Sequence, residues 1–458
     1  MIDNLKPYSN YKHSKSLWIG DIPSHWEVRS LRTLIRSRNE RNRPDLPLLS
    51  VAREKGVFVR SITGDDDNHN VIPDDLSNYK AVRAGNLVIN KMKAWQGSMG
   101  IAPCDGVVSP AYYVFDFDME DPAYGQALLR SKPYVAHFGQ ASDGVRVGQW
   151  DLSIPGMRQI PVIIPPVDEQ TAVVRFLNYA NLRIEKAIQA KRKVIALLNE
   201  QKQAIIHRAV TRGLDPNVKL KPSGLPWLGD MPEHWEVFRI KYLLREVDHR
   251  SATGSERLLS MRMYHGIVPF DEHFTRPPQA ASLIGFKIVR PGQLVVNRMQ
   301  AGNGVIFPSH LDGLVSPDYA VFDPIADVNI DYLGELFRSR TVRAKFRSES
   351  KGLGTGTSGF LRLYNDRLGA IHIAIPSRGE QELILHGMNA QQASLNTAIS
   401  HAEREIELLL EYRTRLISDV VTGKLDVRQA ATRLPDEVET LDDTPVEYND
   451  DTGEEGEE

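Results

Sequence analysis

Residues 18–28 read Trp-Ile-Gly-Asp-Ile-Pro-Ser-His-Trp-Glu-Val, and residues 227–237 read Trp-Leu-Gly-Asp-Met-Pro-Glu-His-Trp-Glu-Val. Eight of the eleven positions are identical at an offset of 209 residues. A match of this length at so long an offset indicates an internal repeat, which constrains the architecture before any single residue is given a role. The chain is therefore expected to contain two copies of one fold.

The repeat continues in the same order along the chain. An offset that drifts by only a few residues in about two hundred fits two domains of ordinary size, each followed by a second kind of segment. Three further motifs recur at offsets of 207, 207 and 211 residues: 83–92 as 290–299, 105–110 as 312–317, and 164–170 as 375–381.

The second kind of segment has the pattern of a long helix. Between Glu169 and about Val210 there is no proline or glycine, and apolar residues recur at steps of three, four and seven. These steps keep the apolar side chains on one narrow stripe, the seam of a coiled coil. The seam positions are Leu177, Ile184, Ile188, Ile195, Leu198 and Ile205 in the first copy, and Met388, Leu395, Ile399, Ile406, Leu409 and Leu416 in the second.

The two stripes match at an offset of 211 residues, so the two helices are natural partners. Because each helix leads from one domain toward the next, the simplest pairing is antiparallel, with Lys191 and Lys202 as weak points of the first stripe. The alternative is a long helix that packs flat on its own domain.

The pattern predicts an α/β (α+β) two-copy repeat, in which two globular domains are joined by two long helices that pair as an antiparallel coiled coil. The predicted segments are a first domain at 1–164, a first helix at 165–214, a second domain at 215–375, a second helix at 376–428 and an acidic, disordered tail at 429–458.

Composition excludes several classes of protein. A chain of 458 residues with 41% apolar content can bury two cores. A single cysteine, Cys104, excludes a disulfide framework and fits a reducing compartment. No apolar run approaches the ~18 residues of a membrane span, and the polar start of the chain does not resemble a signal peptide. We expect a cytoplasmic protein that does not contact a membrane.

The net charge of −3 conceals a basic folded part. Residues 435–458 hold twelve Asp and Glu and no Lys or Arg, so the rest of the chain carries a formal charge of +9. The composition of this segment is typical of disorder. It can serve solubility, or it can imitate a nucleic acid and shield the basic surface.

Basic residues recur at corresponding places in both copies, which favours contact with nucleic acid. Phosphate contact needs cations, and base reading needs Arg, Lys, Gln or Asn at the groove edges. The alternative is a solvated basic face. The candidate DNA-binding residues are Arg53, Lys55, Lys91, Lys93, Gln96, Arg146 and Gln149 in the first copy, and Arg262, Arg298, Gln300, Lys351, Thr355 and Thr357 in the second.

Motifs for other chemistry are weak. The glycine-rich run at 352–356 lacks both the Lys-Ser/Thr ending of a phosphate loop and the strand-to-helix setting of a dinucleotide fingerprint. Asp65–Asp67 with His69 has no counterpart in the second copy, so a charged loop is favoured over a metal site. His25 and His234 lack partners at ligand spacing and are expected to support the adjacent tryptophans. No catalytic residue and no metal site is predicted.

Several of these motifs together resemble the DNA-specificity (S) subunit of type I restriction-modification systems. The resemblance covers roughly residues 6–428 and rests on the elements at 18–28, 85–92, 108–112, 164–170 and 415–427. It implies two target-recognition domains, each reading one half of a bipartite, interrupted DNA sequence, and two helices that set the gap between the halves.

The resemblance also implies partners. These are double-stranded DNA, two modification (methyltransferase) subunits, and restriction (translocase and nuclease) subunits in a complex of bacterial defence. The methyl donor and ATP are then expected on the partner subunits, so that this chain has no cofactor and is a non-catalytic subunit of a methyltransferase and endonuclease complex. The acidic tail is not explained by the resemblance.

Two other functions stay open. A coiled-coil protein-protein scaffold without DNA binding would have the same helices, and its basic segments would be plain surface. A methyltransferase is suggested by residues 108–112 and 315–319, which resemble the Ser/Asn/Asp-Pro-Pro-Tyr loop of amino-methyltransferases. The second proline is missing from both, and no glycine-rich donor-binding turn lies upstream, so a turn that closes a strand pair is favoured.

Overall fold

The chain is described here from a computed structural model, which describes residues 5–60, 75–146, 149–263, 265–274, 277–278, 280–353 and 360–435. These residues form two compact units. Unit 1 comprises the described residues of Met1–Arg192 and Glu403–Glu458, and unit 2 comprises those of Lys193–Ala402. Two helices, α4 (Val167–Arg212) and α9 (Arg378–Val421), contribute one part to each unit.

The other elements of unit 1 are the strands β1 (Tyr11–His13), β2 (Asp21–Pro23), β3 (Glu27–Ser30), β4 (Ile35–Arg38), β5 (Leu49–Ala52), β6 (Gly56–Val59), β7 (Lys80–Val82), β8 (Leu87–Asn90), β9 (Met99–Ile101), β10 (Gly106–Val108), β11 (Tyr112–Phe117), β12 (Ser142–Arg146), β13 (Gln149–Leu152) and β14 (Pro161–Ile164), and the helices η1 (Leu31–Thr33), η2 (Ala94–Gln96), α1 (Pro122–Leu129), α2 (Lys132–Gln140), α3 (Ile154–Arg158) and α10 (Arg428–Thr432).

The other elements of unit 2 are the strands β15 (Leu220–Pro222), β16 (Asp230–Pro232), β17 (Glu236–Arg239), β18 (Leu244–Val247), β19 (Leu259–Arg262), β20 (Gly266–Pro269), β21 (Lys287–Val289), β22 (Leu294–Asn297), β23 (Ile306–Pro308), β24 (Gly313–Val315), β25 (Tyr319–Pro324), β26 (Lys351–Leu353), β27 (Phe360–Arg362) and β28 (His372–Ile375), and the helices η3 (Ile240–Tyr242), η4 (Ala301–Asn303), α5 (Phe270–His273), α6 (Ile330–Arg338), α7 (Arg340–Glu349) and α8 (Asn365–Ala370).

The sheets of the two units have the same topology. Unit 1 contains an antiparallel sheet of order β4-β11-β8-β9, and unit 2 contains β18-β25-β22-β23. The remaining pairs also correspond, from β3–β14 with β17–β28 to β12–β13 with β26–β27. Antiparallel sheets with separate helices make this an α+β fold in two copies, as the sequence predicted.

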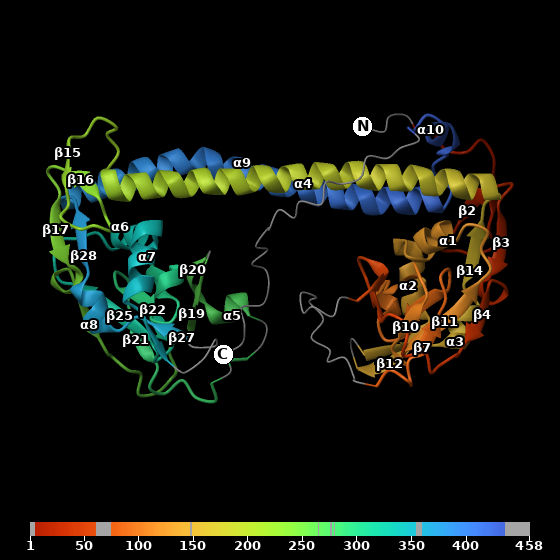
Figure 1. Cartoon of the computed structure of the whole chain (residues 1–458), viewed down its shortest axis with the longest axis horizontal. Coiled ribbons are helices and arrows are strands. Elements are labelled where there is room, and N and C mark those ends of the chain that lie inside the picture. The colour runs from red at the N-terminus through yellow and green to blue at the C-terminus, as the bar shows by residue number, and fades with distance from the viewer. Residues whose placement is uncertain are drawn as a thin grey trace. The chain divides into compact units, whose positions relative to one another are not determined.

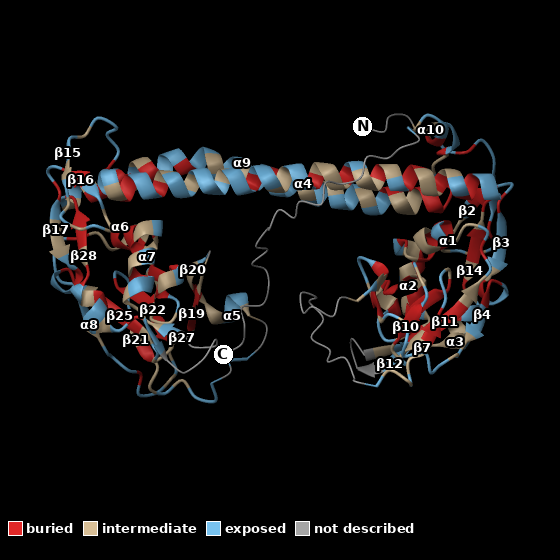
Figure 2. Ribbon diagram, viewed as in Figure 1, coloured by how far each residue is buried: buried red, intermediate tan, exposed pale blue. Residues whose placement is uncertain are grey.

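Both faces of each four-stranded sheet are buried. Leu87 and Ile89 of β8 pack in the large core of unit 1 together with Leu128 of α1 and Phe138 of α2. Val88 between them packs in a smaller cluster on the other face. Because side chains alternate across a strand, two buried faces require the continuous apolar run of the repeated motif. Figure 2 shows this burial along the strands.

The long helices α4 and α9 are antiparallel in both units. In unit 1, Glu185 pairs with Arg413 at 3.3 Å, and Lys191 pairs with Glu405. In unit 2, Nζ of Lys202 donates to Oδ1 of Asn396 at 2.8 Å. Partner numbers on α9 fall as numbers on α4 rise, and Figure 1 shows the two helices side by side within each unit. The predicted antiparallel pairing is confirmed, and both lysines that interrupt the stripe have polar partners on α9.

The seam residues differ in how far they are buried. Leu177, Ile184, Ile188, Ile195, Met388 and Leu416 are buried, whereas Leu198, Ile205, Leu395, Ile399, Ile406 and Leu409 are half-buried. Ile206 is buried next to the half-buried Ile205, and Gln392 and Ala402 are also buried on α9.

Each unit is fastened to the first turn of a long helix by the repeated tryptophan element. In unit 1, Nε1 of Trp26 donates to Glu169 of α4 at 2.7 Å, and Nε2 of His25 bonds to the same carboxylate at 2.8 Å. In unit 2, the distances from Trp235 and His234 to Glu380 are 3.0 and 2.8 Å. The histidines therefore act on the helix itself, while both indoles are buried, as expected.

The same units also hold the last turn of the other long helix. The hydroxyl of Tyr124 donates to the carbonyl of Val421 at 3.2 Å in unit 1, and that of Tyr332 donates to the carbonyl of Val210 at 3.1 Å in unit 2. Burial raises the pKa of both phenols well above the usual range, so they remain donors. Each unit thus contacts the start of one long helix and the end of the other.

Unit 1 adds an arginine contact that has no counterpart among the described residues of unit 2. Arg428, at the start of α10, donates to Glu169 at 2.9 Å and is bonded to Asp426. Its bond to Asp426 raises the pKa of Arg428, and the charge of Glu169 adds to this effect. The predicted tail began at 429, whereas residues 428–432 form α10 and Ala431 is buried. The acidic residues from 436 onward lie outside the described residues.

No helix in the described part of the chain is both long enough and apolar enough to cross a membrane.

A glycine in the repeated Asp-Gly-Val-Val-Ser-Pro motif is required by a close approach. A Cβ at Gly106 would lie 2.5 Å from Cγ of Leu49 and 2.8 Å from the carbonyl oxygen of Pro47. We therefore expect Gly106→Ala to lower the free energy of unfolding by about 1 to 3 kcal/mol. Gly379→Ala is the control, because that position on α9 has no atom within 4 Å of an added Cβ. Equal urea midpoints for the two variants would contradict this reason for the glycine.

Candidate nucleic-acid interface

The loop at 91–97 has a fixed backbone. Oδ1 of Asn90 accepts the backbone N–H of Met92 at 3.1 Å as the chain leaves β8. Ala94, the first residue of η2, is fully buried, and Gly97 ends the turn with φ of +88°. A left-handed residue at this position favours glycine. The loop contains the predicted DNA-binding residues Lys91, Lys93 and Gln96.

The loop at 298–304 repeats this backbone in unit 2. Oδ1 of Asn297 accepts the N–H of Met299 at 3.1 Å, Ala301 is fully buried, and Gly304 has φ of +93°. Each loop is tied to the same neighbour, because the N–H of Leu152 donates to the carbonyl of Lys91 and that of Leu363 to the carbonyl of Arg298, both at 2.9 Å. The loops therefore share a frame and differ in side chains.

The first cation of each loop is paired within its own unit. Lys91 is 2.9 Å from Asp151 of β13, a hydrogen bond that raises the pKa of Lys91. Arg298 pairs with Glu246 of β18, and its side chain is only 16% exposed. Lys93 and Gln300 are exposed, and Gln96 is half-buried. The two paired cations support their loops, and Lys93 and Gln300 are the more accessible to a ligand.

Arg53 and Lys55 lie in the turn between β5 and β6, where both are exposed. Arg130, which follows α1, donates to the carbonyls of Arg53 and Glu54 at 2.5 and 2.8 Å and so holds the turn. Nζ of Lys55 lies 5.5 Å from the ring centre of Phe58. The strands β6 and β9 approach closely at two glycines: a Cβ at Gly100 would lie 3.2 Å from Cα of Gly56.

The remaining candidates lie on hairpins and strand ends. Arg262 ends β19, with its guanidinium 5.2 Å from the ring centre of Phe274. Arg146 pairs with Gln149 across β12 and β13, although the structure describes only the backbone of these two residues. Lys351 is exposed at the start of β26. The predicted positions Thr355 and Thr357, and the charged segment Asp65–Asp67 with His69, lie outside the described residues. No finding tests any of these residues as DNA contacts, which therefore stay predictions.

The structure brings α2 and α7 against the two loops, a contact that the sequence analysis did not predict. A Cβ at Gly97 would lie 3.2 Å from Val135 of α2, and one at Gly304 would lie 3.0 Å from Arg343 of α7. Nη2 of Arg347 on α7 donates to the carbonyl of Gly302 at 3.1 Å. From the sequence, Arg347 could have been identified only by aligning α2 with α7 and noticing the four cations in Arg340–Arg347.

Residues 29–43 contain six arginines, and three of them are paired with carboxylates within unit 1. Arg29 pairs with Glu27, Arg38 with Glu40 and Asp116, and Arg43 with Asp45. Exposed ion pairs of this kind add little stability, but they reduce the charge offered to a phosphate. Half of the arginines at 29–43 therefore offer less charge to a phosphate than their number in the sequence indicates.

Other features offer little chemistry. In the described part of the chain, no group of three or more His, Cys, Asp or Glu could hold a metal ion. The segments 108–112 and 315–319 each form a turn between two strands, with the N–H of Tyr112 or Tyr319 donating to the serine carbonyl. This is the turn that the sequence favoured over a methyltransferase loop.

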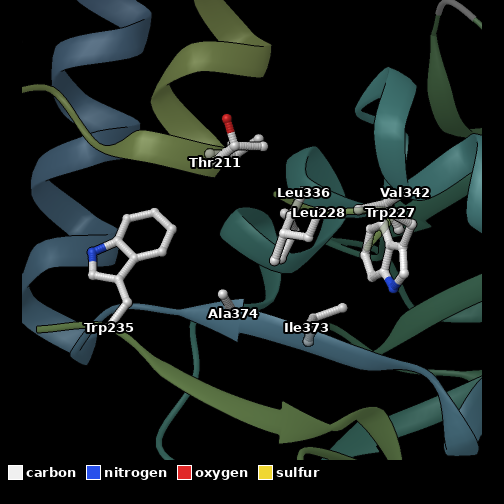
Figure 3. A pocket seen from close by; sticks show the side chains of 9 residues that line it. Thr211, Trp227, Leu228, Trp235, Leu336, Val342, Ile373 and Ala374 are labelled. Atoms are coloured by element: carbon white, nitrogen blue, oxygen red, sulfur yellow. The ribbon is translucent and has the colours of Figure 1, made fainter. Parts of the chain in front are cut away.

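An apolar pocket in unit 2 belongs to the packing of the tryptophan element. Its one hydroxyl, on Thr211, donates to the carbonyl of His207 at 2.6 Å, so the lining presents no free acid, base or nucleophile. Figure 3 shows the pocket, which is lined by Val210, Thr211, Trp227, Leu228, Trp235, Leu336, Val342, Ile373 and Ala374.

Comparison with known proteins bears on the resemblance. No family model matches the chain. A protein of Methanocaldococcus jannaschii assigned as the MjaX type I restriction enzyme specificity subunit is 20% identical over 254 residues, 52% of this chain and 56% of that protein. The chain thus spans about half the length of this curated relative.

Solved structures extend the similarity to most of the chain. A chain solved in work on the assembly and conformational transition of a type I R-M system matches with a TM-score of 0.61 and 13% identity, covering 88% of this chain and 99% of that one. The HsdS subunit from Thermoanaerobacter tengcongensis matches with a TM-score of 0.43 and 13% identity, covering 88% and 97%. The first of these structures confirms the predicted fold, and the curated relative is itself assigned to the family that the motifs resemble.

Proposed function

We propose that this chain is the DNA-specificity subunit of a type I restriction-modification system and that each unit reads one half of a bipartite, interrupted target. One observation carries the proposal: the two units share a constant frame and carry different loops. The Trp and His contacts to Glu169 and Glu380 repeat, and so does the backbone of the two loops. Their side chains differ, which is what reading two different half-sites requires.

The long helices are proposed to set the gap between the half-sites. The helix α4 has 46 residues and α9 has 44, and at ~1.5 Å per residue each is about 65 to 70 Å long. Each unit holds the start of one helix and the end of the other. A spacer built in this way would convert helix length into base-pair spacing, as dimer geometry does for half-sites elsewhere.

Partners are proposed to supply the chemistry. In this proposal, the complex forms with double-stranded DNA, two modification subunits and restriction subunits in the cytoplasm. The chain itself has no catalytic role, and the methyl donor and ATP bind to the partners. The fold similarity to a chain of a type I R-M system supports this assembly.

The proposal predicts salt-dependent DNA binding with an identifiable contribution from Lys93, an exposed cation of the 91–97 loop. We expect Lys93→Ala to weaken binding to all sequences alike and to lower the slope of log affinity against log salt by about one. The measurement is fluorescence anisotropy of the full chain with labelled duplexes at about 50 to 300 mM salt. Lys12→Ala is the control, because Lys12 is an exposed cation of β1.

The scaffold alternative makes the opposite prediction. A coiled-coil scaffold without a DNA role would show weak affinity with no sequence preference, and Lys93→Ala and Lys12→Ala would behave alike. That outcome would contradict the proposed function.

A further inference from the structure

Each loop packs against a helix of its own unit, the 91–97 loop against α2 and the 298–304 loop against α7. At this contact, the large residue and the glycine change places between the two units. In unit 1, the loop supplies Trp95 and the helix α2 supplies Gly139, and a Cβ at Gly139 would lie 3.8 Å from Cβ of Trp95. In unit 2, the loop supplies Gly302 and the helix α7 supplies Arg347, whose Cβ would lie 3.2 Å from a Cβ at Gly302. We call this position, 95 with 139 in unit 1 and 302 with 347 in unit 2, the slot between loop and helix. The loop supplies its large side chain in unit 1, and the helix supplies it in unit 2.

The two loops keep the same backbone, but their slots present side chains of different chemistry. In unit 1, the indole N–H of Trp95 donates to the carbonyl of Met92 at 3.1 Å, and the Trp150 ring lies 5.1 Å away, centre to centre. Both rings are half-buried. Because this N–H is already bonded to the backbone, the slot of unit 1 offers mainly apolar ring surface.

In unit 2, the slot presents an oriented cation. Arg347 is exposed, and its Nη2 donates to the carbonyl of Gly302 and to Oδ1 of Asn303, both at 3.1 Å. Asn303 in turn donates to Gln300 at 2.6 Å. Within the described part of the chain, both hydrogen bonds of the Arg347 guanidinium are donated by the same nitrogen, Nη2. Its Nε–H and the other terminal nitrogen are held in a fixed direction.

We infer that this slot is the position at which the two units read their half-sites differently, a role that rests on the proposed function. The apolar surface at Trp95 suits the 5-methyl group of thymine, and the guanidinium of Arg347 suits the O6 and N7 acceptors of guanine. The slot adjoins Lys93 and Gln300 in its two loops, so a base contact here would be accompanied by groups suited to the DNA backbone.

Arg347 is tested first, because an exposed side chain can be changed with little risk to folding. The full chain, assembled with its modification subunits, selects from duplexes randomised in both half-sites. We expect Arg347→Ala to lose a guanine preference at one position of the half-site read by unit 2, by about 5- to 150-fold, and to leave the other half-site unchanged. Ser348→Ala, the next residue on α7, should leave both half-sites as they are. An equal loss for all sequences would show a phosphate contact and overturn the inference.

The exchanged pair allows a second test. Trp95→Gly combined with Gly139→Arg gives unit 1 the arrangement of unit 2, and Gly302→Trp combined with Arg347→Gly does the reverse. We expect the first pair to replace a thymine preference by guanine at one position of the half-site read by unit 1. The reverse pair should act on unit 2 and keeps the test open if one double variant fails to fold. Unchanged preferences in a folded double variant would show that the slot is packing alone.

The two proposals fail in different ways. If the unaltered complex selects no sequence, both the proposed function and this inference are wrong. If it selects a bipartite sequence that none of these variants alters at a single position, the proposed function stands and this inference is overturned.

Discussion

Glu169→Gln is expected to lower the free energy of unfolding by about 3 kcal/mol, because one buried carboxylate receives several donors. Its side chain is 4% exposed, and it is bonded to Trp26, His25 and Arg428 at 2.7, 2.8 and 2.9 Å. Burial and the charge of Glu169 raise the pKa of Tyr8, so that phenol also stays protonated beside it. Glutamine keeps the volume but turns one acceptor into a donor that faces other donors.

The second copy supplies the matched control. Glu380 is bonded to Trp235 and His234, has no arginine partner among the residues that the structure describes, and is 27% exposed. Glu380→Gln should therefore cost about 1 kcal/mol. The two variants are compared by denaturant midpoints from circular dichroism. A midpoint change as large for Glu380→Gln as for Glu169→Gln would show that burial and the arginine partner do not decide the strength of the anchor.

Lengthening both long helices together is expected to widen the preferred gap in the DNA without changing either half-site. Seven residues are inserted in α4 between Lys191 and Lys202, and seven in α9 between Asn396 and Glu405, so that the interhelical pairs on either side keep their partners. Seven residues add ~10 Å of helix, or about three base pairs at ~3.4 Å each. Selection from duplexes with randomised gaps measures the change.

A variant that keeps the original helix length tests whether helix length causes the change of gap. In this control, the exposed positions of 193–199 are replaced by different helix-forming polar residues, while Ile195 and Leu198 are kept. It should select the original gap. If the insertion also selects the original gap in a folded protein, the long helices do not set the spacing.

Much of the fold could be predicted because both copies of the repeat carry the same apolar patterns. The apolar run at 87–89 forms a strand that is buried on both faces, and apolar steps of three, four and seven predicted the stripe on α4. Single positions were less certain. Periodicity could not choose between Ile205 and Ile206, which are adjacent and both apolar, and the structure buries Ile206 more deeply.

The candidate interface was less predictable because its important contacts join distant parts of the chain. The sequence identified Lys91 and Arg298 as cations but not their partners Asp151 and Glu246, which make them supports for their loops. Arg428 meets Glu169 across 259 residues, with no local signal. The exchange of Trp95 for Arg347 appears only when loop and helix are seen together, since neither residue alone breaks a pattern.

The central claim is that this chain selects the DNA sequence on which its partners act. The most direct test is methylation mapping by single-molecule sequencing in cells that carry this chain with its neighbouring modification subunit, compared with cells that lack only this chain. The account predicts a new interrupted motif with methyl adenine in both halves, present only when the chain is present. No new motif, with the chain folded and the modification subunit expressed and active, would contradict it.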